Sequence, residues 1–331
     1  MNRRRFLFGV GVATVLQYAA GTRAAERMRH IGFLDRGSPS AFGDYADISE
    51  WYAALKELGW IEGENLVIER RYANTDDQLP ALAQDLVRRK VELIVAGGGT
   101  PTILAAMSAT RTIPIVMWSV GDPVAQGIVA SLAHPGGNVT GFAVLPVEIH
   151  AKRISLLREI LPATSRVGEL VDATNPATRV VHSRIEQTYR SLRIEPVFVE
   201  VARPDELEPA VAEMARRRAE VVNLPDVNWI YANRNWESIV RAASKYRLPV
   251  VVDTPNEILE GGALFAYTLS YEELQRRNAA FVDRILRGAK PSDLPIEQPT
   301  KFDLEINLQA AKALGITIPQ SVLLRAEKVI R

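Results

Sequence analysis

The chain has 331 residues, of which 47% are hydrophobic and 24% charged, and its formal net charge is +1. A chain of this length can form two domains of ordinary size, and the composition is typical of a globular protein. Cysteine is absent, which excludes disulfides, thiolate metal sites and cysteine nucleophiles. Nucleic acid is not an expected partner, because no basic stretch interleaved with aromatic residues follows the N-terminus.

Residues 1–25 have the features of an export signal peptide. Arginines at positions 3–5 come first, residues 8–20 are mostly apolar, and small residues suited to cleavage follow at 21–25. The apolar part is too short to predict a membrane span. Residues 3–7 also resemble a twin-arginine signal. We therefore expect a periplasmic protein, exported by either the twin-arginine or the general secretory route.

After the signal, apolar strands alternate with amphipathic helices. In the first half, strands are expected at 29–34, 66–72, 91–96, 113–118 and 139–145, with helices at 48–58, 76–89 and from 100. In the second half, helices are expected at 147–160, 177–192, 204–218 and 233–246, and strands at 166–171, 196–201, 220–224, 248–252 and 263–267. This spacing predicts mostly parallel sheets with right-handed crossovers.

The predicted fold class is α/β, with two doubly wound, Rossmann-like lobes joined by a multi-strand hinge around a ligand cleft. We place the N-terminal lobe at 28–145 and the C-terminal lobe at 146–267. Residues 268–331 form a crossover segment, within which a helix at 271–288 returns to the N-terminal lobe. The remainder, with an extended piece at 299–307 and a helix from 308, braces the hinge and the C-terminal lobe.

The stretch 91–102 is the most informative part of the sequence. A buried strand ends in three glycines (97–99), Thr100 stands at an expected helix N-cap, and Pro101 fits the first helical position. The free N–H groups and the positive dipole end of such a helix favour an anion such as a carboxylate. A tight turn and a cap without any ligand is the alternative. Walker and Gly-x-Gly-x-x-Gly spacings are absent, so neither a nucleotide phosphate nor a nicotinamide cofactor is indicated.

Ligands of open α/β sheets bind beyond the carboxyl ends of the strands. Aromatic residues there could form apolar walls, although core packing is the alternative for each. Asp122 precedes a proline, so it could equally cap a turn and start a helix at Val124. The candidate ligand-binding residues are Ser38, Gly99, Thr100, Thr102, Trp118, Asp122, Thr174, Asn175, Asp226, Trp229, Asp253 and Tyr267.

The usual parts of an enzyme are absent. The four histidines are scattered without metal-ligand spacing, and no Gly-x-Ser-x-Gly elbow occurs. We expect no catalytic residue, no metal and no cofactor. Acids facing each other across the cleft could still transfer protons, which leaves an exported enzyme as an alternative.

Three segments resemble a family signature: Ile-Pro-Ile-Val at 113–116, Gly-Asp-Pro-Val at 121–124, and residues 127–141, which contain His-Pro-Gly-Gly-Asn-Val-Thr-Gly. Segments 286–294 and 306–319 extend the resemblance. The family is the ABC-transporter substrate-binding proteins that include tryptophan-binding members with the type I periplasmic binding-protein fold. Two positions depart from it, since His134 replaces an expected arginine and Thr268 a common glycine.

The resemblance implies that a ligand binds between two lobes and that the closed form is presented to an ABC permease in the inner membrane. Members that bind amino acids hold the carboxylate at helix starts of the first lobe, which matches Thr100 and Thr102. The amine would then need an acid, Asp226 or Asp172. We expect a monomeric solute-binding protein of an ABC importer for an amino acid or related small carboxylate, with Trp118 and Trp229 favouring an aromatic one. A periplasmic sensing module for a receptor or kinase is the alternative.

Overall fold

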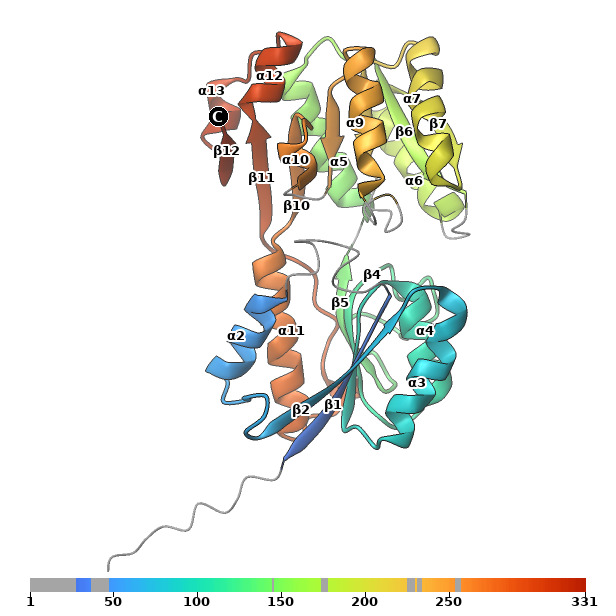
Figure 1. Ribbon diagram of the computed structural model, residues 1–331, viewed down its shortest axis with the longest axis vertical. Helices are drawn as coiled ribbons and strands as arrows, with labels where there is room; N and C mark the ends of the chain where they lie inside the picture. Colours follow the sequence, from blue (N-terminus) through green and yellow to red (C-terminus); the bar gives the residue numbers. More distant parts are fainter. Residues whose placement is uncertain are drawn as a thin grey trace, which may run out of the picture.

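The computed structural model describes residues 28–36, 48–144, 146–173, 178–224, 230, 234–253 and 257–331. Two lobes, each built on its own sheet with helices on both faces, lie one above the other (Figure 1). This arrangement confirms the predicted α/β class with mostly parallel sheets in two lobes. The strand limits differ from the expected ones by a few residues at most.

The first lobe is a five-stranded parallel sheet with the order β2-β1-β3-β4-β5. Its strands are β1 (Arg29–Arg36), β2 (Leu66–Ala73), β3 (Leu93–Ala96), β4 (Ile115–Gly121) and β5 (Val139–Val144). The helices α3 (Leu79–Arg88) and α4 (Thr100–Ala109) cover one face, and α2 (Ser49–Glu57) and α11 (Tyr271–Leu286) cover the other. All four residues of β3 are buried, which explains its apolar sequence.

The helix α11 packs on the first lobe although it comes more than 100 residues after the rest of that lobe. The indole Nε1 of Trp51 donates to Asn278 Oδ1 (3.1 Å), and the backbone N–H of Trp51 donates to Gln275 Oε1 (3.0 Å). All three side chains are buried, so these bonds join α2 to α11 inside the core.

The second lobe is a seven-stranded sheet with the order β12-β11-β10-β9-β8-β6-β7. Its strands are β6 (Arg166–Asp172), β7 (Glu195–Val201), β8 (Val221–Leu224), β9 (Val250–Val252), β10 (Phe265–Leu269), β11 (Phe302–Asn307) and β12 (Lys328–Ile330). Among its described strand pairs, only β10 and β11 are antiparallel. Its helices are α5 (Pro146–Ile160), α6 (Thr178–Ser191), α7 (Leu207–Arg216), α9 (Trp236–Lys245), α10 (Glu257–Glu260), α12 (Leu308–Leu314) and α13 (Gln320–Leu323).

The chain passes between the lobes after β5, after β10 and before β11 (Figure 1). The strands β10 and β11 pair antiparallel from Phe265–Ile306 to Leu269–Phe302, and β10 leads directly into α11. These antiparallel strands brace the connection because their backbone hydrogen bonds continue up to the point where the chain leaves the second lobe.

Candidate functional site

The strand orders predict a ligand crevice at the carboxyl edge of each sheet. In the first lobe the order reverses between β1 and β3, and in the second it reverses between β6 and β8. At such a reversal, the crossovers of two adjacent parallel strands leave in opposite directions, and a gap opens between the loops at the carboxyl ends of these strands. Ligands of this fold class bind in that gap. Asp35 at the end of β1 and the glycines after β3 border the first crevice. Asp172 at the end of β6 borders the second.

One row of side chains crosses the carboxyl edge of the first sheet. Asp35 pairs with Tyr72, Leu34 pairs with Ala96, and Ala96 pairs with Met117. Extending the last two pairs by one residue places Asp35 beside Gly97 and Gly97 beside Trp118. The row is therefore Tyr72, Asp35, Gly97 and Trp118. Since alternate residues share a face, these four lie on the α2 and α11 side of the sheet.

Trp118 and Tyr72 are the outer aromatic members of a larger cluster. Phe33 lies between them, with ring centroids 5.9 Å from Trp118 and 6.3 Å from Tyr72, and the buried ring of Trp51 packs behind it. Phe33 is 2% exposed, whereas Trp118 and Tyr72 are only partly buried. Trp118 thus packs on the core while part of its side chain stays exposed, and its role as an apolar wall of a ligand site remains a prediction.

The start of α4 lies next to this row. Gly99, with φ of 87°, is the N-cap, and Thr100 is the first helical residue, so the prediction that Thr100 caps the helix is wrong by one position. Glycine is favoured at that cap because its positive φ strains any other residue. The Thr100 hydroxyl donates to Gln126 Oε1 (2.7 Å), and the Gln126 amide donates to the Gly121 carbonyl. Gln126, which sequence reasoning missed, therefore ties the helix start to the end of β4.

Thr102 lies in the first turn of α4 and is fully buried. Its hydroxyl has no hydrogen-bond partner among the described residues. Buried hydroxyls are normally paired, and side chains in a helix lean toward its N-terminus. Thr102 is therefore a buried, unpaired polar group in the helical turn whose N–H groups have no intrahelical acceptor, and its contact with a ligand remains a prediction.

Asp122 follows β4 with a φ of 38°. Its Oδ1 accepts from the Ala125 backbone N–H (3.0 Å), and its Oδ2 lies 3.2 Å from an Arg184 guanidinium nitrogen on α6 of the other lobe. The expected turn is present, but the helix expected from Val124 is wrong, since residues 123–127 form a turn instead. The Asp122 carboxylate joins the rims of the two lobes, and its ligand contact remains a prediction.

A buried polar network lies at the carboxyl end of the second sheet. The Arg153 Nε donates to Asn223 Oδ1 (2.8 Å), and the Arg153 Nη1 lies 3.5 Å from Asp253 Oδ2. The Asn223 amide donates to both Glu169 oxygens (2.8 and 3.0 Å), and Glu169 also accepts from Tyr189. Arg153 is 3% exposed, so this network orients Asp253 from inside the lobe. No motif in the sequence identified it.

Burial controls protonation in this network. It raises the pKa of Glu169 to about 7, against the hydrogen bonds from Tyr189 and Asn223 and the nearby Arg153 charge, which lower it. Burial, assisted by the Arg153 charge, lowers the pKa of His150 to about 2, so that imidazole stays neutral. The His150 Nδ1 lies 3.7 Å from Glu169.

The remaining predicted residues lie apart from these groups or outside the described residues. Tyr267 on β10 stacks on Phe302 of β11 with ring centroids 5.7 Å apart, beside the connection between the lobes. Ser38, Thr174, Asn175, Asp226 and Trp229 lie outside the described residues.

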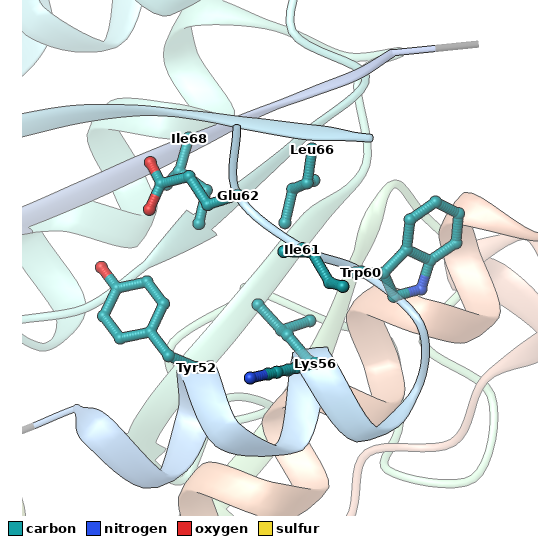
Figure 2. Close-up of a pocket in the computed structure, with 8 residues that line it drawn as sticks. Tyr52, Lys56, Trp60, Ile61, Glu62, Leu66 and Ile68 are labelled. Carbon is teal, nitrogen blue, oxygen red and sulfur yellow. The ribbon is translucent and has the colours of Figure 1, made fainter. Parts of the chain in front are cut away.

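A separate cavity of about 160 Å³ lies between α2 and the beginning of β2 (Figure 2). Its lining residues are Tyr52, Leu55, Lys56, Trp60, Ile61, Glu62, Leu66 and Ile68. Leu66 and Ile68 belong to the amino-terminal half of β2, so the cavity lies at the opposite end of the sheet from the row described above.

The described residues hold no group of three or more histidine, aspartate or glutamate side chains arranged for a metal ion. Among the described helices, none combines the length and apolar character needed to cross a membrane.

Two doubly wound lobes, with polar and aromatic residues at the carboxyl ends of their strands, define a solute-binding protein of the type I periplasmic binding-protein class. The chain belongs to the ABC transporter substrate binding proteins, whose family model matches residues 44–330. This membership confirms the resemblance that the segments between residues 113 and 141 indicated.

Individual relatives agree with this assignment. The chain is 26% identical over 267 residues to a tyrosine-binding protein of Clostridioides difficile, covering 80% of this chain and 74% of that protein. A conserved domain protein from Vibrio cholerae has a similar structure (TM-score 0.80, 28% identity, 91% of this chain and 99% of that one). A Streptococcus pneumonia ABC domain in complex with L-Trp shares the fold (TM-score 0.79, 23% identity, 92% of this chain and 100% of that one).

Proposed function

We propose that this protein is a periplasmic, monomeric binding protein that captures an aromatic amino acid, or a related small aromatic carboxylate, and delivers it to an ABC permease. The observation that carries the proposal is the row Tyr72, Asp35, Gly97, Trp118 beside the start of α4. An aromatic side chain fits the partly open rings of Tyr72 and Trp118. A carboxylate fits the first-turn N–H groups and the unused Thr102 hydroxyl.

Three further observations support the proposal. The relatives named above include a tyrosine-binding protein and a structure in complex with L-Trp. The export signal features of residues 1–25 fit a periplasmic location. Asp253 and Asp172 lie at strand ends of the second lobe, where that lobe would contact the ligand as the two lobes close.

Mass spectrometry of whatever co-purifies, followed by a thermal-shift screen of the amino acids, tests the proposal. Aromatic amino acids should raise the melting temperature, since a ligand at 100 times its Kd stabilises the native state by about 2.7 kcal/mol. Recovery of the compound unchanged would argue against an enzyme. A screen in which another ligand class stabilises the protein and aromatic amino acids do not would overturn the proposal.

A matched pair of variants locates the site. Trp118→Leu should remove the shift, because it deletes one aromatic wall of the crevice. Trp60→Leu alters the separate cavity at the other end of the sheet (Figure 2) and should preserve it. Isothermal titration calorimetry then gives the affinity of each variant for the compound that the screen identifies.

A further inference from the structure

Asp35 occupies an unusual position for a carboxylate. It is the penultimate residue of β1, it borders the crevice, and it lies beside Gly97 in the sheet register. A Cβ atom at Gly97 would lie 2.5 Å from Asp35 Oδ2, and one at Gly98 would lie 2.6 Å from Asp35 Oδ1. The carboxylate therefore rests on the glycine turn, and glycine at both positions leaves it that space.

No cation neutralises this carboxylate among the described residues. Its one hydrogen bond there comes from the Arg36 backbone N–H (2.6 Å). The Arg36 guanidinium instead lies 2.8 Å from Asp76, and Arg71 on β2 pairs with Asp85. Asp253 of the second lobe differs in this respect, because Arg153 lies 3.5 Å from it.

We propose that Asp35 binds the ammonium group of the ligand, so that the first lobe alone holds both the ammonium and the carboxylate of an α-amino acid. This inference rests on the proposed function and assigns the amine to the first lobe, not to Asp172 or Asp226. The carboxylate and the ammonium group of an amino acid are bonded to the same carbon atom. The protein groups that bind them must therefore be neighbours. Asp35 and the start of α4 are neighbours around Gly97 and Gly98, and Tyr72 and Trp118 receive the side chain.

The protonation of Asp35 agrees with this role. Burial raises the pKa of Asp35 to about 7, against the hydrogen bond from Arg36. Burial is the main cause that raises the pKa of Tyr72 on β2, and the nearby Asp35 charge also raises it. A bound ammonium lowers the pKa of Asp35, so binding near pH 6.5 should release part of a proton to the solvent.

Calorimetry on wild type, Asp35→Asn and Asp172→Asn tests the proposal. Asp172→Asn tests the rival assignment of the amine, because Asp172 ends β6, the strand equivalent to β1 in the other lobe. The probes are L-tyrosine and L-tryptophan, each against its deaminated analogue, 3-(4-hydroxyphenyl)propionate or indole-3-propionate. Wild type and Asp172→Asn should prefer the amino acid, and Asp35→Asn should lose about tenfold to 100-fold of that preference.

Each outcome decides a different point. Preference that survives in Asp35→Asn, or that is lost in Asp172→Asn, overturns the assignment of the amine to Asp35 and leaves the proposed function intact. A wild type that binds neither member of either pair overturns the proposed function and this inference together. If Asp35→Asn folds poorly, the wild type tests the proposal by calorimetry at pH 6.5 in two buffers of different ionisation enthalpy. Proton release is expected with the amino acid only. Equal proton release with the amino acid and its deaminated analogue would contradict the proposal.

Discussion

Asp122 and Arg184 form an ion pair between the two lobes, with a distance of 3.2 Å between Asp122 Oδ2 and Arg184 Nη1. Asp122 belongs to the turn after β4 of the first lobe, and Arg184 belongs to α6 of the second. The side chains are 34% and 55% exposed, so solvent screens the pair. Such exposed pairs contribute about 0.2–1 kcal/mol, enough to bias an equilibrium between open and closed forms but not to lock it.

Removing this ion pair should weaken ligand binding slightly and in a salt-dependent way. Asp122→Asn keeps the hydrogen bond from Ala125 but removes the charge, and Arg184→Gln removes the other charge. Each change should raise the Kd by less than about fivefold at low salt and by nothing measurable at 1 M salt. Arg190→Gln is the control, because Arg190 pairs with Glu186 within α6. An effect of equal size in that control, or one that persists at high salt, would contradict a role for the interlobe pair.

Thr102→Val should affect stability and binding in opposite directions. Its buried hydroxyl has no partner among the described residues, so an isosteric valine removes an unsatisfied group and should leave the free energy of unfolding unchanged or higher. Binding should weaken, because the ligand carboxylate loses a donor. Thr140→Val is the control, since the Thr140 hydroxyl donates to the Leu294 carbonyl (2.9 Å) and its loss should cost about 1 kcal/mol. A Thr102→Val protein with unchanged affinity would show that the ligand does not use this hydroxyl.

Gly97→Ala should lower the stability of the protein, because the added methyl group clashes with the Asp35 carboxylate. The added methyl group would lie 2.5 Å from Asp35 Oδ2, and overpacking of this kind costs about 1–3 kcal/mol. Asp35→Ser should relieve that clash, so chemical denaturation of the two single variants and the double variant should give a clear coupling energy. Gly137→Ala is a neutral control, because nothing lies within 4 Å of its Cβ position. Additive effects of Gly97→Ala and Asp35→Ser would contradict the close packing of the carboxylate on the glycine turn.

Glu169 should make the stability of the protein depend on pH. Burial raises its pKa from the ordinary value of 4.5 to about 7 in the folded protein, so between these limits the folded state binds more protons than the unfolded state. The Glu169 contribution to the free energy of unfolding should therefore fall by about 3 kcal/mol as pH rises from 4.5 to 7. Urea denaturation across that pH range gives the free energy of unfolding of the wild type and of Glu169→Gln. The difference between the two isolates this contribution. His150 gives a slope of opposite sign, because its folded pKa of about 2 lies below the ordinary value of 6.5. A wild-type to Glu169→Gln difference that does not vary with pH would contradict the burial of an uncharged carboxyl group.

The local pattern of the sequence was sufficient for the fold class and for the glycine turn that precedes the helix at residue 100. Continuous apolar runs such as residues 93–96 predict strands buried on both faces, and amphipathic periodicity predicts the helices between them. The glycines at 97–99 predict a turn before a helix, and the structure has that turn with its cap one residue earlier than expected. These features depend on neighbours within a few residues, so they are visible in a linear sequence.

Only the tertiary structure brought together Asp35 with Gly97, Asp122 with Arg184, and Arg153 with Asp253 and Asn223. Asp35 and Gly97 are 62 positions apart, and sheet register makes them neighbours. Asp122 and Arg184 are likewise 62 positions apart and belong to different lobes. A single sequence carries no signal for such pairs, because each follows from the packing of whole elements. The order of elements and the helix start are therefore determined locally, whereas the neighbours of Asp35, Asp122 and Arg153 are decided by register and by the placement of the two lobes.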